Sequence, residues 1–269
     1  MLKKTWLIII STALVFISAC VLGVSTVYRV SDVTVRAATI SDEAEAEARE
    51  LQEHLQQAYY KRSMFSIDDN IAESVLVQFP YFRIVSMEKV YPNRLIIHVS
   101  EDEEVYAIAT QSGDGYYILN AEGTVLSIRE DYVNRKETDE NAKNVLLSGL
   151  SVSAVKGETV IGDDALTYLL PFCTRVSELL EGIRKNVVSV ELIKGGSSPT
   201  THILKLQMIE GVVIYVRNPS EKTLAKAEKA VEAYFALPDG AHTKGMIAVY
   251  EQEDNVVTMY STKDDFVQN

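Results

Sequence analysis

Residues Thr5 to Val27, with the sequence TWLIIISTALVFISACVLGVSTV, decide how the rest of the chain is organised. This stretch contains no charged side chain and no proline. At about 1.5 Å of rise per residue, a helix of this length crosses a hydrocarbon layer of about 30 Å. A helix also satisfies its own backbone hydrogen bonds, which lipid requires. The sequence therefore predicts a single membrane-spanning helix over residues 5–27.

The charges around this stretch predict its orientation. Lys3 and Lys4 are the only charges before it, so residues 1–4 are expected to be a short cytoplasmic tail, with the bulk of the chain extracytoplasmic. A cleaved signal peptide would have a shorter apolar core of about 7–15 residues. The segment Ile17-Ser18-Ala19-Cys20 offers another alternative, because it resembles the site at which bacterial lipoproteins are cut and acylated on cysteine. The chain stays apolar beyond Cys20, which favours an uncleaved anchor.

The composition of the remaining chain limits its partners. Beyond Lys3 and Lys4 it carries 24 Lys and Arg against 38 Asp and Glu, a net charge of −14. Such an acidic balance argues against a nucleic-acid partner and against adhesion to an anionic membrane surface. Cys20 and Cys173 are the only cysteines, so no internal disulfide is expected.

The first exported segment, residues 28–101, has the pattern of a small α+β domain. Alternating apolar residues predict strands, and apolar residues at intervals of three and four predict helices. The expected order is strand, helix, helix, strand, strand, over residues 30–36, 41–60, 66–79, 82–90 and 95–100.

Residues 102–261 read as a second domain that is rich in short strands. Two helices are predicted within it, over residues 162–183 and 219–237, the second with its lysines on the outer face. The domain closes with a hairpin of two strands, residues 246–250 and 256–260, and residues 262–269 are expected to be a flexible tail.

No stretch of the sequence predicts catalysis. The four histidines lie in different predicted elements, without the spacing of metal ligands. The acidic run Glu101 to Glu104 lacks the glycine turn and alternating ligands of a calcium loop, so a charged junction between the domains is expected. Cys173 is expected to face the core of a helix. The sequence therefore predicts a protein that is not an enzyme, with no metal, cofactor or small-molecule substrate.

Several motifs follow one another in an order typical of one family. Residues Glu88 to Glu101 read EKVYPNRLIIHVSE, and residues Tyr116 to Leu126 read YYILNAEGTVL. A short motif, Leu147 to Leu150, follows, and near the end the strand Gly211 to Val216 leads into a helix. Together with the N-terminal anchor, this order resembles the FtsQ/DivIB family of bacterial cell-division proteins.

The resemblance implies an architecture and a role. The expected fold is α+β: one N-terminal transmembrane helix, then a POTRA domain of β-α-α-β-β order, then a second β-rich domain with flanking helices. The implied function is a non-catalytic scaffold in the cell membrane at the division septum, which recruits or stabilises other single-pass proteins of the FtsB/DivIC and FtsL types. The alternative is an envelope protein of another kind, such as a lipoprotein or a membrane-tethered cell-wall enzyme.

The last hairpin is the predicted partner-binding site. An unpaired edge strand can accept a strand from another protein, with backbone bonds giving affinity and side chains giving specificity. The residues expected to act there are Tyr250, Val256, Val257, Thr258, Met259 and Tyr260. The alternative is that the C-terminal tail covers this edge. A second, lesser candidate is a POTRA surface at Tyr81, Phe82, Val33 and Val35.

Overall fold

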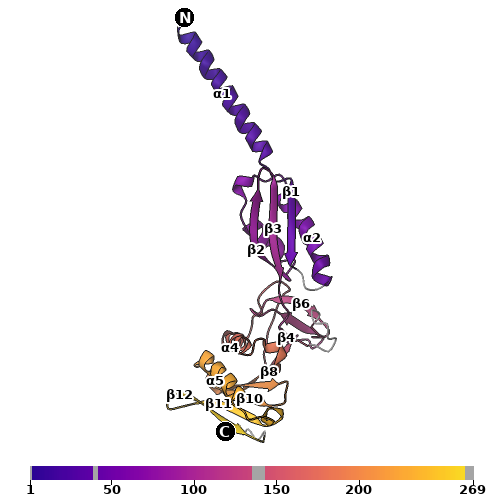
Figure 1. Cartoon of the computed structure of the whole chain (residues 1–269), viewed down its shortest axis with the longest axis vertical. Helices are drawn as coiled ribbons and strands as arrows, with labels where there is room; N and C mark the ends of the chain where they lie inside the picture. The colour runs from indigo at the N-terminus through magenta and orange to yellow at the C-terminus, as the bar shows by residue number, and fades with distance from the viewer. Residues whose placement is uncertain (1, 39–41, 135–142, 264–269) are drawn as a thin grey trace. The chain divides into compact units, whose positions relative to one another are not determined.

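The computed structural model describes residues 2–38, 42–134 and 143–263. The chain divides into two compact units, Met1–Asp102 and Glu103–Asn269 (Figure 1). The first unit begins with helix α1, Leu2–Val27. Within the described ranges no helix combines the length and the apolarity that a membrane crossing needs.

The rest of the first unit is a three-stranded sheet packed against helices. Its elements in chain order are β1 (Asp32–Ala38), α2 (Asp42–Tyr59), η1 (Met64–Ser66), α3 (Asn70–Leu76), β2 (Phe82–Val90) and β3 (Arg94–Glu101). β3 lies in the middle of the sheet, parallel to β1 and antiparallel to β2. Leu51 and Leu55 of α2 are fully buried in the same core as Leu95 and Ile97 of β3.

The second helix of this unit is shorter than the sequence predicts. Instead of one helix over residues 66–79, Met64–Ser66 form a separate 3₁₀ turn and α3 begins only at Asn70. The buried Tyr59 explains the break, because its hydroxyl donates to the Asp68 carbonyl at 2.9 Å and accepts from the Ala72 N–H at 3.1 Å. This hydroxyl satisfies a donor in the first turn of α3, as a cap does. Burial raises the pKa of Tyr59 to about 12.

The second unit is built on one sheet of nine strands, in the spatial order β12-β11-β10-β9-β8-β7-β4-β5-β6. Its strands are β4 (Tyr106–Ala109), β5 (Tyr116–Leu119), β6 (Val125–Arg129), β7 (Val145–Ser148), β8 (Val187–Lys194), β9 (His202–Met208), β10 (Val213–Arg217), β11 (Met246–Gln252) and β12 (Asn255–Ser261). Its helices are α4 (Leu166–Leu179) and α5 (Thr223–Phe235), with short turns η2 (Ile183–Lys185), η3 (Pro199–Thr201) and η4 (Ala241–Thr243).

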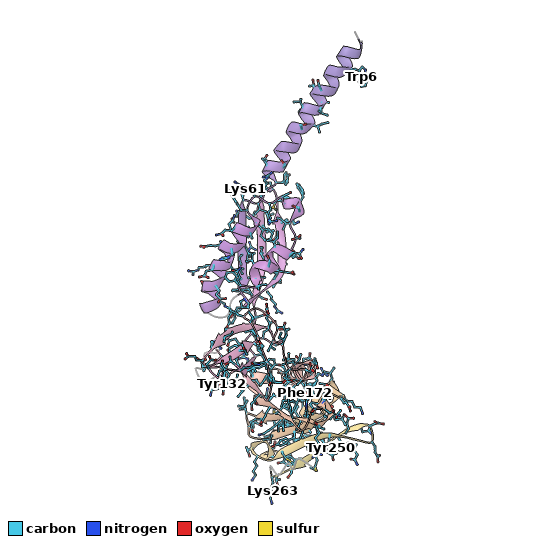
Figure 2. All side chains as sticks on the ribbon, turned by 180° about the vertical axis from the view of Figure 1, so that it is seen from behind. Trp6, Lys61, Tyr132, Phe172, Tyr250 and Lys263 are labelled. Carbon is cyan, nitrogen blue, oxygen red and sulfur yellow. The ribbon has the colours of Figure 1, made fainter. Side chains whose placement is uncertain are left out.

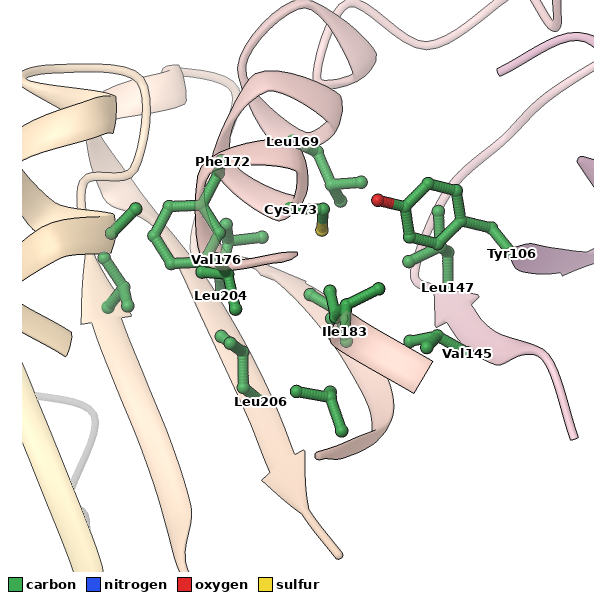
Figure 3. Packing of buried hydrophobic residues seen from close by; sticks show 14 of the residues in the cluster. Tyr106, Val145, Leu147, Leu169, Phe172, Cys173, Val176, Ile183, Leu204 and Leu206 are labelled. Carbon is green, nitrogen blue, oxygen red and sulfur yellow. The ribbon is translucent and has the colours of Figure 1, made fainter. Parts of the chain in front are cut away.

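Two crossovers bring both long helices to the same core. Parallel strands need a crossover, and here α4 connects β7 to β8 while α5 connects β10 to β11. Phe172 and Cys173 of α4 and Ala227 of α5 are fully buried in one cluster with strand residues such as Leu204 (Figure 3). Arg175 of α4 also bridges to Glu228 of α5 at 2.7 Å.

Both helices are shorter than the sequence predicts. α4 begins at Leu166 rather than residue 162, because the Asp163 carboxylate accepts the N–H groups of Ser151 and Ala165 in a preceding turn. α5 begins at Thr223 rather than residue 219, because Asn218 and Lys222 adopt left-handed backbone conformations that interrupt a helix.

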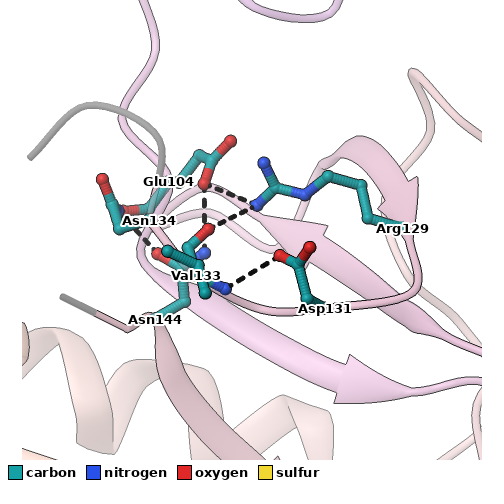
Figure 4. A network of polar contacts seen from close by, with 6 residues as sticks. All are labelled: Glu104, Arg129, Asp131, Val133, Asn134 and Asn144. Carbon is teal, nitrogen blue, oxygen red and sulfur yellow. Dashed lines mark hydrogen bonds and ion pairs between the residues drawn. The ribbon is translucent and has the colours of Figure 1, made fainter. Parts of the chain in front are cut away.

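Glu104, in the acidic run predicted to be a charged junction between the domains, is buried in a polar network (Figure 4). Arg129 donates to its carboxylate at 2.9 Å and to the Val133 carbonyl at 3.0 Å. Asn144 donates to the same carboxylate at 3.1 Å, and Asn134 donates to the Glu104 carbonyl and to Asn144. The network ties the start of the second unit to β6 and to the chain on both sides of residues 135–142.

We expect Arg129→Met to lower the free energy of unfolding of the second unit by about 3 kcal/mol or more, because it leaves the buried Glu104 carboxylate without its cation. Urea denaturation of the full chain measures this. Arg36→Met, which removes an exposed arginine from β1, is the control and should change stability little. Equal effects of the two substitutions would contradict the proposed importance of the network.

Candidate partner-binding edge

β12 is the last strand of the nine-stranded sheet, and no strand in the described part of the chain pairs with its outer side. It runs antiparallel to β11, with Tyr250 opposite Val257 and Gln252 opposite Asn255. A two-residue turn, Glu253-Asp254, joins the two strands. Both turn residues have positive φ, 49° and 63°, as a hairpin turn that follows the twist of a sheet requires.

The turn fixes which backbone groups face outward. A two-residue hairpin closes on a hydrogen-bonded pair, here Gln252 and Asn255, and such pairs alternate along the ladder. The N–H and C=O groups of Val256, Thr258 and Tyr260 therefore point away from β11, toward the open side of the sheet.

The predicted binding residues lie on this hairpin but on two different faces. Thr258 and Tyr260 stand opposite Val249 and Ile247, whose side chains enter the core beneath the helices, and Val256 packs against the same core. Val257 and Met259 stand opposite Tyr250 and Ala248, on the other face of the sheet. Met259 is 49% exposed and Tyr260 36%. The edge thus offers apolar side chains on both faces of β12.

The hairpin is braced from within by a buried lysine. The sequence predicts Lys226 of α5 on the outer face of the helix, but its side chain is fully buried. Its ammonium group donates to the Asn218 carbonyl at 2.6 Å and forms an ion pair with Glu251 of β11 at 2.5 Å. Lys222 donates to the Asp254 carbonyl in the hairpin turn at 2.6 Å. Since a charge is buried only when paired, Glu251 is what permits Lys226 to lie there.

The position of β12 also depends on a glycine before β11. Gly245 has φ of +98°, and a Cβ on it would collide with the carbonyl oxygen of Ser261 at the end of β12. Tyr260 closes over the same place, since its hydroxyl donates toward the carbonyls of Ala241 and Lys244 at 3.4 and 3.3 Å. The end of β12 is therefore held in close contact with the start of β11.

The second surface predicted from the sequence, at Tyr81, Phe82, Val33 and Val35, is wrong in part. Val33 and Phe82 are buried in the core of the first unit, at 2% and 4% exposure, and cannot present a binding surface. Tyr81 and Val35 are half-buried against that core. Strand β1 is a sheet edge, but two glutamines of α2 lie along it.

These glutamines replace a neighbouring strand. The Gln56 side chain accepts the Val33 N–H at 2.6 Å and donates to the Ser31 carbonyl at 3.1 Å. Gln52 accepts the Val35 N–H at 3.3 Å. The outward N–H groups of Val33 and Val35 are thus already bonded, so this part of the edge is less open to an incoming strand. The spacing of four between the glutamines, which places them on one helix face, was the available signal in the sequence.

The histidines and the described cysteine lie apart from one another. His54 packs edge-on against Phe79, His202 bonds Tyr168 at 2.7 Å, and His242 lies 3.3 Å from Glu210. Burial raises the pKa of the Cys173 thiol to about 12, so it stays protonated. No three metal-ligating side chains come together in the ranges that the structure describes.

Comparison with known proteins identifies the domain type of the first unit and one similar protein. Residues 29–102 match the model of the POTRA domain, FtsQ-type, so the first unit carries a POTRA domain. Over 160 residues the chain is 24% identical to "Cell division protein DivIB" of Clostridium acetobutylicum, a match that covers 59% of this chain and 57% of that protein. The chain therefore spans less than two thirds of this relative's length. These two matches support the resemblance of the chain to the FtsQ/DivIB family of bacterial cell-division proteins.

Acid is expected to loosen the brace beneath the hairpin. The hydrogen bond from Lys226, opposed by desolvation and aided by Lys222, lowers the pKa of Glu251 below its usual 4.5. A carboxyl whose pKa is lower in the folded state adds stability above its unfolded pKa and loses it as the pH falls through the folded value. The melting temperature of Glu251→Gln should therefore lie below that of the wild type at pH 7, and the difference should shrink below about pH 4. A difference that stays constant down to pH 3 would contradict this role.

We expect Gly245→Ala to displace the end of β12, because the added methyl collides with backbone rather than with a movable side chain. Gly240→Ala is a matched control: Gly240 also has positive φ, +81°, but nothing lies within 4 Å of the Cβ position. Both variants carry the backbone cost of a left-handed alanine, of order 1 kcal/mol. Amide hydrogen exchange of β11 and β12 should accelerate more in Gly245→Ala, and equal acceleration would refute the steric argument.

Proposed function

We propose that this protein is a non-catalytic scaffold of the bacterial division machinery that recruits other single-pass division proteins by strand addition at β12. The FtsQ-type POTRA domain and the similarity to a DivIB cell-division protein support a role in cell division. The observation that carries the mechanism is the open outer side of β12, with its flanking apolar side chains.

The proposal includes a membrane anchor over residues 5–27 of α1; it rests on the sequence and goes beyond the described part of the structure, in which no helix is long and apolar enough for a span. The charge-free stretch of residues 5–27 lies within this helix. Apolar side chains along it, among them Trp6, Leu14 and Phe16, are 64–70% exposed, and a large exposed apolar surface needs a cover. Its polar side chains bond back to the helix, as Ser18 does to the Leu14 carbonyl at 2.8 Å. Lys3 and Lys4 favour a cytoplasmic N-terminus, with the chain beyond Val27 on the outer side at the septum.

The contrast between the two edge strands supports the choice of β12. Gln52 and Gln56 bond the N–H groups of Val33 and Val35 at the β1 edge, whereas Val256, Thr258 and Tyr260 present backbone groups without a strand beside them in the described ranges. A strand from a partner would bond to these groups. Its side chains would meet Thr258 and Tyr260 on one face and Val257 and Met259 on the other.

The partners that we propose are proteins of the FtsB/DivIC and FtsL types. A strand-forming segment with apolar residues on alternate positions would fit both faces of β12. Because backbone bonds supply the affinity and a few side chains supply the selection, removing one outward N–H tests the mode of binding directly.

We expect Thr258→Pro to abolish capture of the partner, because proline removes an outward N–H that an added strand would use, while it breaks no bond to β11. Thr258→Ala is the matched control and should retain capture, since it keeps the N–H. Full-length protein in detergent, purified from its own cells, is assayed for FtsB/DivIC-type and FtsL-type proteins by mass spectrometry. Val257→Asp with Tyr260→Asp should also lose them, through side chains on both faces.

Circular dichroism and melting temperature establish that each variant remains folded. If folded Thr258→Pro captures the partners as well as Thr258→Ala does, strand addition at this edge is wrong. If the aspartate pair also retains them, the partners bind another surface. If the wild type captures neither type, the recruiting function itself is contradicted.

A further inference from the structure

Three aromatic rings cluster at one end of the POTRA domain. One of them belongs to Tyr28, the first residue after the end of α1. The ring of Tyr28 lies 5.2 Å from that of Phe65 and 5.8 Å from that of Tyr91, and Phe65 and Tyr91 are 6.0 Å apart. Rings at these separations attract one another, so the three side chains form one surface. We call it the aromatic cluster.

The fold fixes this cluster next to the end of α1. The helix ends at Val27, and the Tyr28 carbonyl accepts the Met64 N–H at 2.9 Å. The Val30 N–H donates to the Arg62 carbonyl at 2.9 Å. Immediately beyond the helix, the chain is therefore already bonded into the POTRA domain, and the cluster cannot move far from the point where α1 ends.

The cluster is exposed although its rings are large and apolar. Phe65 is 62% exposed and Tyr91 53%, while Tyr28 is half-buried between them. Tyr60, five residues before Phe65 in the chain, is 53% exposed as well. The exposed parts of these rings do not pack in the core of the domain. They could be buried only by contact with something outside it.

The net charge of the segments around the cluster is positive, whereas the net charge of the exported chain as a whole is negative. The segments 28–32, 60–69 and 89–94 meet at this end through backbone bonds such as Ser31 N–H to the Asn93 carbonyl. They hold five cations and three carboxylates, whereas the chain beyond Lys4 has a net charge of −14. Lys61, labelled in Figure 2, and Arg62 precede Phe65 by four and three residues, and both side chains are exposed. The net negative charge of the whole chain argues against contact with an anionic membrane. That argument does not apply to this end of the domain, where cations outnumber carboxylates.

We propose that the aromatic cluster docks the POTRA domain on the headgroup region of the bilayer from which α1 emerges, with Lys61 and Arg62 contacting anionic phospholipids. The proposal rests on α1 being a membrane anchor. Tyrosine and other aromatic rings favour the interface between lipid and water, where one part of the ring is apolar and another is wet. Cations beside them gain from the negative surface potential of anionic lipids. Docking restricts the tilt of the POTRA domain on the membrane.

The test uses full-length protein in nanodiscs that contain an anionic phospholipid brominated just below its carbonyl groups, because bromine quenches tryptophan on contact. Trp6 is the single tryptophan of the chain, so its emission in the wild type reports whether α1 is inserted. In a Trp6→Phe background, Phe65→Trp reports on the cluster. Phe235→Trp is the matched control, since Phe235 has the same 62% exposure but lies in the second unit.

The expected result is quenching of Trp6 in the wild type and of the tryptophan in Phe65→Trp, with little quenching in Phe235→Trp. Adding Lys61→Glu and Arg62→Glu to Phe65→Trp should lower the ratio of docked to undocked protein by about tenfold or more. Tyr91→Trp repeats the readout should Phe65→Trp perturb the loop.

Two outcomes would overturn the proposal in distinguishable ways. If Trp6 is quenched while Phe65→Trp and Tyr91→Trp behave like Phe235→Trp, docking is wrong and the anchor stands. If Trp6 itself is not quenched, α1 does not enter the bilayer, and both the anchor and the docking are refuted.

Discussion

The constraint on which this structure depends is that a strand at the edge of a sheet has backbone groups that no neighbouring strand satisfies. The two units meet this constraint differently. In the POTRA domain, Gln52 and Gln56 of α2 supply the bonds that a neighbouring strand would give to β1. In the second unit β12 keeps its outer side open among the described residues, while contacts on its inner side hold that strand in place.

β12 is held in place by a series of contacts, the first of which lie away from the sheet edge. Glu251 permits Lys226 to be buried, and Lys226 fixes α5 against the loop that contains Asn218. Lys222 then bonds the hairpin turn, whose two residues adopt a conformation that few residues other than glycine or asparagine favour. A strand held so firmly loses little further entropy when a partner adds to it, which favours binding by pre-organisation.

Several parts of this arrangement could be predicted from the sequence because they follow from local patterns. The order of strands and helices in the POTRA domain and the final hairpin come from apolar periodicity, which reports burial along a single element. The position of β12 at an edge is only a hypothesis at the level of sequence, because the order of strands in a sheet depends on non-local pairing. Periodicity places the helix starts too early, at residues 66, 162 and 219, where tertiary bonds such as those of Tyr59 and Asp163 interrupt the helices.

The buried charges could not be predicted for a related reason. Lys226 lies on a helix with other lysines, and Glu104 lies in a run of four acidic residues, so composition alone favours solvent for both. Each is buried only because a partner distant in sequence, Glu251 or Arg129, meets it in the fold. The local excess of cations around Phe65 could not be predicted from composition either, because the net charge of the whole chain is negative.

Both proposed binding surfaces are places where the fold leaves groups unsatisfied, and each needs a partner whose chemistry matches those groups. At β12 they are directional backbone donors and acceptors, which only another extended backbone can match in register. At Tyr28, Phe65 and Tyr91 they are non-directional apolar rings beside cations, which a fluid interface of lipid headgroups can match without register. On these two proposals, the directional edge would give specificity, and the aromatic cluster would give orientation relative to the membrane.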